Sequence, residues 1–323
     1  MSTASRERKP NFFYNIAKNY PVVVIFIVLV ILFSILYHER FLSPANLTAT
    51  LRQFVTLILF SIGPTFVMLL GSMDQSFIGI WMLGSALLWI LTPILGPISL
   101  LVFPLFGIAS GLLIGLIHVK LRVPSFILTL SVLIVYWGLT VIIVQGNPRI
   151  VPGYEFLTAD FIPFIPTPFL YSIVIILLAV FIVKRTKLGT YFYAIGSNEE
   201  GARLAGIDVG KYKIVAFTLS GFFSGIGSIV LFQHLGGTVP VSFSMNNVVR
   251  PLIAIILGGT PLSGGRGGPQ RTILGALTFS VIYRGLYLSA LDAEVIDLIV
   301  GLILIVSIVI SSRGGELRGV EIA

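Results

Sequence analysis

Ten apolar runs recur along the chain, and they constrain its fold more than any other feature. Most approach the roughly 20 residues that carry a helix across a bilayer. They fall at residues 22–37, 53–70, 77–95, 98–118, 126–144, 169–183, 214–233, 249–258, 272–290 and 295–311. With 56% hydrophobic and only 11% charged residues, the chain differs from a soluble domain, in which about 25% of residues are charged. The sequence therefore predicts an all-α polytopic membrane protein with about ten transmembrane helices between residues 21 and 312. The short run at 249–258 and the proline-interrupted join at 93–97 leave the exact count open.

The distribution of positive charge predicts the orientation of these spans. An even number of spans places both termini on one side of the membrane. With the N-terminus inside, sixteen of the 21 Lys and Arg residues fall in cytoplasmic segments. Of the others, Arg40, Arg52, Arg149 and Arg250 fall outside, and Arg284 falls within a span. We therefore expect a cytoplasmic N-terminal segment at 1–20 and a cytoplasmic tail at 313–323. The net charge of +8 then reflects membrane topology rather than nucleic-acid binding.

The residue types needed for several kinds of chemistry are missing. The chain has no cysteine and only three histidines, which are scattered, so we expect neither a disulfide nor a metal site. No GxxxxGK[ST] loop occurs, so the chain is not expected to hydrolyse ATP by itself. The stretch Leu262–Arg266, LSGGR, looks like the signature of ABC ATPases, but it lies between two apolar runs. We predict a non-enzymatic protein with no cofactor.

The longest polar insert that suits the cytoplasm lies between two apolar runs, at residues 184–213. Ser197 and Glu200 have the spacing of a capping box, and Gly206 supplies a C-terminal stop. The sequence predicts a short helix between these points. A helix of this length is not stable alone in water, so we expect another subunit to hold it. Its apolar members, which would fill a groove on that subunit, are Ala202, Leu204, Ala205 and Ile207.

The same insert carries a family resemblance. The residues concerned are Gly189, Tyr191, Tyr193, Ala194, Gly196, Asn198, Glu199, Arg203, Leu204, Gly206 and Ile207. This pattern resembles the cytoplasmic loop of ABC-importer permeases of the ribose type. The glycine-rich stretch at 257–277 resembles a second motif of that family, in the same order. Where the family usually shows Asn-Glu-Ala-Ala, this chain has Glu200 and Gly201 at the last two positions, so the short helix should be soft when unbound.

The resemblance implies partners and a function. It implies half of a homodimeric pore in membrane lipid, served by a cytoplasmic ATPase and an external substrate-binding protein. The solute would be small, neutral and polar, with a monosaccharide as the first expectation and a nucleoside as the alternative. The residues expected to couple the pore to the ATPase are Tyr193, Gly196, Asn198, Glu199, Arg203, Leu204 and Gly206.

Four residues are candidates for the translocation path. Asp74 and Ser76 stand in SMDQS, where the family commonly shows Gly-Ile-Asp-Leu-Ser, and we expect Asp74 near a span end, where its exposure is cheap. Trp81 could stack on a sugar, although aromatic residues in spans more often pack or anchor at the interface. Arg284 is expected in the middle of a span, where a cation costs about 2.5–3.5 kcal/mol, so it should have a partner or an aqueous neighbour.

Two other function classes stay open at this stage. An ion-coupled secondary transporter needs no ATPase, but it usually has acidic groups or broken helices near the midplane. An intramembrane enzyme is the weakest alternative, because no plausible Ser–His pair, cysteine or metal cluster is visible. Small residues at 107, 111 and 115 and at 221, 225 and 228 predict close helix packing rather than a site.

Overall fold

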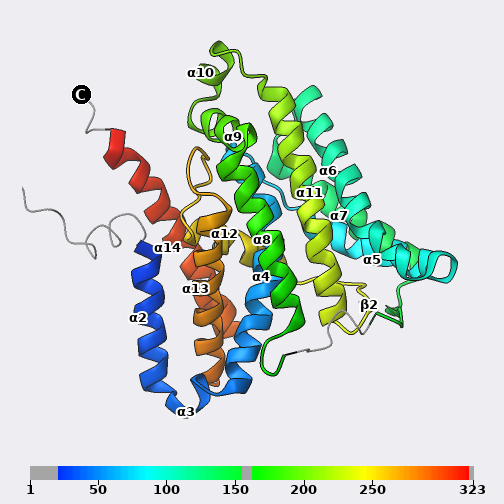
Figure 1. Ribbon diagram of the computed structural model, residues 1–323, viewed down its shortest axis with the longest axis vertical. Coiled ribbons are helices and arrows are strands. Elements are labelled where there is room, and N and C mark those ends of the chain that lie inside the picture. Colours follow the sequence, from blue (N-terminus) through cyan, green and yellow to red (C-terminus); the bar gives the residue numbers. More distant parts are fainter. Residues whose placement is uncertain (1–20, 155–161, 320–323) are drawn as a thin grey trace, which may run out of the picture.

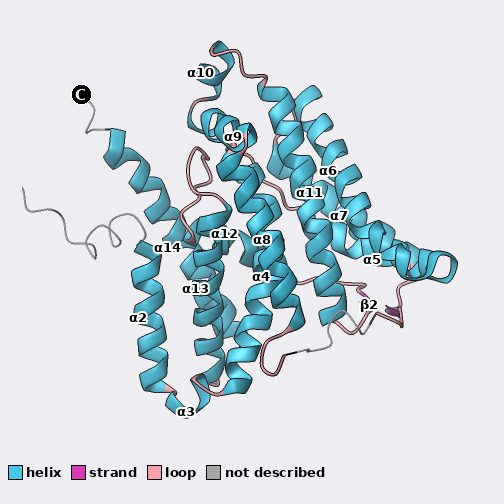
Figure 2. Cartoon of the chain, in the orientation of Figure 1, coloured by secondary structure: helices cyan, strands magenta, loops and turns pink. Residues whose placement is uncertain are grey.

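The computed structural model describes residues 21–154 and 162–319, with side chains up to residue 309. The expected N-terminal segment 1–20 and residues 320–323 of the expected tail lie outside this described part. The described chain is almost entirely helical (Figure 2). Its helices are α2 (Pro21–Leu36), α3 (His38–Phe41), α4 (Pro44–Leu69), α5 (Phe77–Leu95), the 3₁₀ helix η1 (Gly96–Leu101), α6 (Val102–Lys120), α7 (Ser125–Ile143), α8 (Thr167–Arg185), α9 (Lys187–Ser197), α10 (Glu199–Leu204), α11 (Val209–His234), α12 (Met245–Leu257), α13 (Pro269–Leu288) and α14 (Ala293–Gly319). Two short strands, β1 (Arg149–Ile150) and β2 (Thr238–Val239), pair antiparallel.

The apolar runs of the sequence correspond to helices. Five segments of the described chain are long and apolar enough to cross a membrane, at 44–69, 77–120, 125–143, 167–185 and 209–234. The second of these comprises α5, η1 and α6 and has 44 residues, about 66 Å if it were one straight helix, which is about twice the thickness of the hydrocarbon core. Gly96, with a φ of +57°, marks the turn between its two halves. The α-helical membrane character is confirmed, whereas the count of ten spans and their orientation stay predictions.

α4 and α11 form the centre of the bundle, with 78% and 56% of their most apolar windows buried. α11 packs against α6 with almost no side chain between them. A Cβ on Gly107 would collide with the carbonyl oxygen of Gly221, and one on Gly111 would collide with that of Phe217. In lipid, such small residues allow the close backbone approach that drives helix association. The structure confirms the predicted packing role of these glycines.

The outer faces of the bundle are apolar and its centre holds polar side chains. Ile35, Ile142, Val174 and Leu298 are each at least 63% exposed on α2, α7, α8 and α14. Buried hydroxyls instead face the centre, and several donate to the carbonyl four residues earlier in the same helix, as Ser61 and Thr65 do. A lipid-facing surface of this kind is what a membrane bundle requires.

The two ends of the molecule differ in structure (Figure 1). At one end, which we call the α10 end, α9 and α10 project beyond the long helices. At the opposite end, the α3 end, α3 joins α2 to α4, and β2 lies in the lower half of the view, beside the lower end of α11 and below α5. The proline-rich segment at 145–166 lies between α7 and α8 and contributes only β1 as regular structure within its described residues.

Candidate functional site

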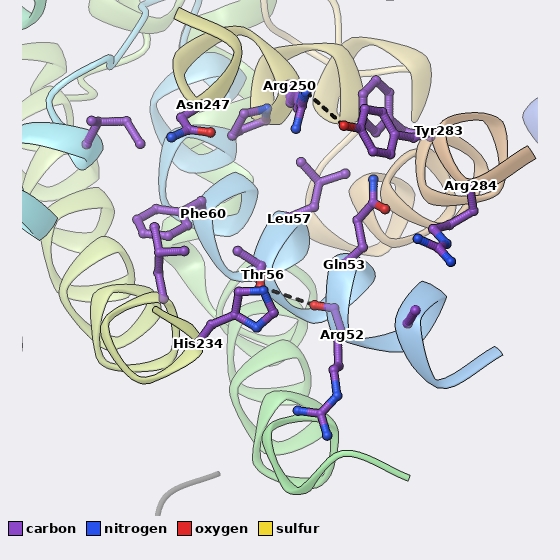
Figure 3. A pocket seen from close by; sticks show the side chains of 15 residues that line it. Arg52, Gln53, Thr56, Leu57, Phe60, His234, Asn247, Arg250, Tyr283 and Arg284 are labelled. Atoms are coloured by element: carbon purple, nitrogen blue, oxygen red, sulfur yellow. Dashed lines mark hydrogen bonds between the residues drawn. The ribbon is translucent and has the colours of Figure 1, made fainter. Parts of the chain in front are cut away.

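A cavity of about 410 Å³ lies between α4, α11, α12 and α13 (Figure 3). Its lining comes from the first half of α4 and the last turns of α11 and α13, so it occupies the half of the bundle nearer the α3 end. The polar lining residues are Arg52, Gln53, Thr56, His234, Asn247, Arg250, Tyr283 and Arg284. The apolar ones include Leu57, Phe60, Ile78 and Phe279. Apolar walls with a few converging polar groups are typical of small-molecule sites, and the volume suits a molecule of monosaccharide size.

Arg284 is held at the wall of this cavity by a neutral side chain. Its Nε and Nη2 donate to Oδ1 of Asn46 at 3.0 and 2.6 Å, and its guanidinium lies 4.9 Å from the ring centre of Tyr287. Asn46 is itself buried and donates to the carbonyl of Phe41 at 2.8 Å. The expectation that Arg284 has a partner is confirmed. Its expected depth was wrong, because Arg284 lies four residues before the end of α13 and not in the middle of a span.

Arg250 enters the cavity from the first turns of α12. Its Nη2 lies 3.6 Å from Oδ1 of Asp297 on α14, and its guanidinium stacks 4.4 Å from the ring centre of Tyr283. Asp297 also accepts a hydrogen bond from Nδ2 of Asn246 at 2.7 Å. Arg250 Nε is buried and has no hydrogen-bond partner among the described residues. The charge of Arg250 is therefore only partly neutralised, and its Nε–H can still donate a hydrogen bond to a ligand.

Sequence reasoning missed most of this cavity. Of the four predicted path residues, only Arg284 lines it. The sequence did contain a signal: Arg52 and Arg250 were two of the four basic residues expected on the outer side of the membrane, where few Lys and Arg residues fall. The neutral groups Gln53, Thr56 and Asn247 gave no signal, since single amides and hydroxyls occur throughout such helices.

Asp74 and Ser76 form a structural cluster away from the cavity lining. Asp74 lies three residues before the start of α5, near a helix end as expected, but it is only 1% exposed, so its expected exposure was wrong. Its Oδ1 accepts from the backbone N–H and the hydroxyl of Ser76 at 2.8 and 2.6 Å, and its Oδ2 accepts from Ser220 Oγ at 2.6 Å. The carboxylate therefore ties the start of α5 to the middle of α11. Trp81 is 2% exposed and packs in an apolar cluster with Phe60, one layer behind the cavity wall.

The short helix predicted between Ser197 and Gly206 exists as α10, but its N-cap is one residue later than expected. Ser197 is the last residue of α9 and does not cap α10. Asn198 is the N-cap, and its Oδ1 accepts from the backbone N–H of Gly201 at 2.9 Å. Asn198 also ends α9 in an extended conformation, so it is the residue that leaves the helical region between the two helices.

The far end of α10 agrees with the sequence. Gly206 has a φ of +83°, its N–H donates to the carbonyl of Arg203, and the N–H of Ile207 donates to that of Ala202, both at 3.0 Å. These two bonds are those of a Schellman motif. The predicted stop at Gly206 is confirmed.

Charged side chains brace α10 from outside. Glu199 pairs with Lys213 at 2.7 Å and with Arg203 at 3.2 Å, and Glu200 pairs with Arg203 at 3.3 Å. Both Arg203 contacts are exposed, so they contribute little to stability. The pair with Lys213 joins α10 to the start of α11 and is the better shielded one, since the Lys213 side chain is only 17% exposed.

The apolar residues of this segment divide between the interior and the surface. Leu204 is 82% exposed, and it is the most exposed large apolar side chain in the described chain. Ala202 is buried and Ile207 is half-buried, and both pack on the main core of this chain. The expectation that Ala202 fills a partner's groove was therefore wrong, and Ile207 uses part of its surface within this chain. Leu204 and the exposed Ala205 remain available.

Tyr193 and Gly196 lie on the inner side of α9 and contact the glycine-rich loop at 258–268. The Tyr193 hydroxyl donates to the carbonyl of Gly267 at 2.8 Å and accepts from Nε2 of Gln270 at 3.4 Å. Burial raises the pKa of the Tyr193 phenol, so the hydroxyl keeps its proton and can donate this bond. A Cβ on Gly196 would collide with the carbonyl oxygen of Leu69 and the amide of Gly265, two groups that hydrogen-bond to each other at 2.9 Å. The segment that carries α10 is thus joined directly to the loop between α12 and α13.

Comparison with known proteins identifies the family. A family model described as the permease component of branched-chain amino acid transport systems matches residues 46–308. The chain belongs to this family. The matched range contains the cavity residues and the α9–α10 segment, and it confirms the family resemblance seen in the polar insert at 184–213. The chain is therefore a transport permease, a multi-pass protein of the plasma membrane, and at the family level a non-catalytic subunit.

Several curated relatives match over most of their length. The ribose import permease protein of Haemophilus influenzae is 31% identical over 274 residues, covering 81% of this chain and 84% of that protein. The D-allose transport system permease protein of Escherichia coli is 28% identical over 88% of this chain and 89% of its own length. The xylose/arabinose import permease protein of Sulfolobus acidocaldarius is 27% identical over 88% of this chain and 82% of its own length. No solved structure matches the chain.

Proposed function

We propose that this chain is the membrane permease subunit of an ABC importer that moves a small polar solute of monosaccharide size. The cavity volume and its polar lining support the size and polarity of the solute. The names of the ribose, D-allose and xylose/arabinose permeases support a sugar-like solute. A nucleoside is the alternative solute, because it also offers hydroxyls and a polar face.

The proposed topology has ten spans, with both termini in the cytoplasm. The spans are α2, α4, α5, α6, α7, α8, α11, α12, α13 and α14, of which α12 spans only part of the bilayer. This arrangement places the α10 end in the cytoplasm and the α3 end, with its nearby cavity, outside. The excess of Lys and Arg on the α10 side supports this orientation. An external binding protein would dock at the α3 end.

The observation that carries the coupling proposal is Leu204 at the tip of α10. A single leucine that is 82% exposed, on a short helix whose other apolar side chain, Ala202, is buried, is suited to fill a pocket on a partner. We assign that partner as a cytoplasmic ATPase. Motion of the ATPase would move α9 and α10 as a unit, because Asn198 is the single residue that separates them.

The contacts inside the chain supply a route from α10 to the cavity. The Tyr193 bond to Gly267 and the close approach of Gly196 to Gly265 connect α9 to the loop at 258–268. That loop joins α12 to α13, which carry Arg250, Tyr283 and Arg284 of the cavity wall. A second copy of the chain would supply the other half of a shared path, as in a homodimeric importer.

The experiment that tests the coupling role uses Leu204→Asp, with Leu121→Asp as the matched control. Leu121 lies at the C-terminal end of α6 and is 70% exposed, so the same change is made at another exposed leucine. We expect Leu204→Asp to insert normally but to lose co-purification with the ATPase and solute-stimulated ATP hydrolysis, while Leu121→Asp keeps both.

The same variant separates the ABC importer from an ion-coupled secondary transporter. Undiminished uptake by Leu204→Asp would rule out the docking role and favour ion coupling. Among the described residues, Asp74 is the buried carboxylate that such a transporter would use. Three serine-derived donors satisfy it already, which favours a structural role.

A further inference from the structure

The cationic groups of the cavity exceed the anionic ones that the described structure sets against them. No Asp or Glu is among the described residues that line the cavity, whereas three arginines line it: Arg52 from α4, Arg250 from α12 and Arg284 from α13. Arg250 lies 3.6 Å from an acid outside the lining, Asp297. Arg284 has no acidic partner in the described part of the chain, and it is held by the neutral oxygen of Asn46. Arg250 and Arg284 together therefore keep about one positive charge without a matching carboxylate.

Arg250 and Arg284 are oriented to bind a ligand in the cavity and are not exposed surface charges. The Arg250 side chain is only 24% exposed, and its buried Nε has no partner among the described residues. Two bonds to Asn46 fix the plane of the Arg284 guanidinium, since they use Nε and Nη2. Figure 3 shows Arg250 and Arg284 at the cavity from α12 and α13, with Gln53 of α4 also directed into it. A planar, pre-oriented guanidinium matches the two oxygens of a carboxylate or phosphate.

Because Arg250 and Arg284 are partly buried, the binding of a neutral solute beside them would cost free energy. A cation removed from water loses solvation, and a polyol that fills the cavity would exclude water without supplying a counter-charge. An anionic solute would supply that charge inside the cavity. The neutral donors and acceptors nearby, Gln53, Thr56 and Asn247, would still be available for hydroxyl groups.

We propose that the transported solute is an anionic sugar, either a sugar acid or a sugar phosphate: a molecule of monosaccharide size with several hydroxyls and one anionic group, a carboxylate or a phosphate ester, which Arg250 and Arg284 bind. This inference rests on the proposed function for the assignment of the cavity to transport. It narrows the solute from any small polar molecule of monosaccharide size to one that carries a negative charge, against the neutral solute expected from the sequence.

The test measures ligand binding by the purified full-length chain in detergent micelles, as the shift in its thermal unfolding temperature. The probes are matched sets, D-galactose with D-galacturonate, and D-ribose with D-ribonate and D-ribose 5-phosphate. We expect at least one acid to raise the unfolding temperature by about 2 °C or more near saturation, since a ligand that binds only the folded state stabilises it. The neutral members should give no shift. Whether the ribonate or the phosphate acts identifies the anionic group.

Variants assign the effect to the cavity. Arg284→Gln should weaken the apparent affinity for the active acid at least about tenfold, the size expected when a charge-assisted bidentate bond is removed. Arg284→Lys keeps the positive charge and should retain part of the affinity for the acid. Arg40→Gln makes the same charge change at an exposed site on α3, outside the cavity lining, and should bind as the parent does. If Arg284→Gln proves too unstable to purify, Arg250→Gln is measured in its place.

Several results would overturn the proposal. They are equal shifts from neutral and anionic sugars, no shift from any acid, an unchanged affinity in Arg284→Gln, or a shift of the same size from sodium acetate or inorganic phosphate. Because this readout needs no ATPase, its failure is distinguishable from failure of the importer assignment. Normal coupling in Leu204→Asp would refute the importer while leaving the acid binding intact.

Discussion

At the scale of single residues, Asp74 shows how a buried charge can serve the fold. Its carboxylate accepts three hydrogen bonds that join α5 to α11. We expect Asp74→Asn to lower the stability of the purified chain by about 1–3 kcal/mol, because a charge-assisted acceptor is lost in a buried site. Ser76→Ala removes only one of the three bonds and should cost less. Thermal unfolding in detergent measures both variants. If Asp74→Asn unfolds like the parent but no longer transports, Asp74 belongs to the translocation path instead.

Residue-level prediction from the sequence succeeded where the cause was local. The stop at Gly206 follows from the backbone freedom of glycine, and the need of Arg284 for a partner follows from the cost of a buried cation. The N-cap was misplaced because two consecutive residues can both cap a helix. Ser197 has the capping-box spacing to Glu200, but α9 extends through Ser197, and Asn198 is the residue left to break the helix.

At the scale of elements, the α6–α11 contact depends on missing side chains. We expect Gly111→Ala to disrupt the bundle, because the new Cβ would meet the carbonyl oxygen of Phe217 and the backbone of Thr218, which cannot move aside as a side chain can. Overpacking of this kind costs about 1–3 kcal/mol or more. Gly138→Ala on α7 is the matched control, since nothing lies within 4 Å of its Cβ position. Size-exclusion chromatography and thermal unfolding should separate the two variants. Equal behaviour would mean that the two helices can move apart at little cost.

The link between α9 and the glycine-rich loop also belongs to this scale. Tyr193→Phe removes the hydroxyl that donates to Gly267 while keeping the ring. We expect the variant to retain ATPase binding and ATP hydrolysis but to transport several-fold less solute per ATP, because the motion of α9 is transmitted less faithfully. Tyr191→Phe is the control. Tyr191 lies on α9 as Tyr193 does, but its ring packs on Tyr212 of α11. A parental ratio of solute to ATP in Tyr193→Phe would exclude this bond from coupling.

At the scale of the whole molecule, the sequence predicted the class of fold but not the cavity. Apolar runs of membrane length require helices whose backbones bond internally, so helix positions could be predicted from local composition. The cavity is built by α4, α11, α12 and α13, which lie far apart in the chain. Periodicity reports which face of a helix is apolar, but it does not report which helices meet. Arg250 and Arg284 could therefore be noticed singly, while their common site required the tertiary structure.

The proposed orientation of the whole molecule yields the last prediction, and the absence of cysteine makes it simple to test. The ends of α13 are decisive, because Ser263 precedes it in the glycine-rich loop and Asp292 follows it, and both are exposed. A cysteine replacing Asp292, or Ala45 at the start of α4, should react with a membrane-impermeant maleimide in intact cells. A cysteine replacing Ser263, or Ser197 beside α10, should react only after the membrane is opened. These outcomes follow if the α3 end faces outward and α13 crosses the bilayer once.

Labelling of position 197 in intact cells would mean that the orientation is the reverse of the proposed one. Leu204 would then lie outside the cell and could not dock to a cytoplasmic ATPase. Labelling of positions 263 and 292 from the same side would instead show that α13 does not cross the membrane.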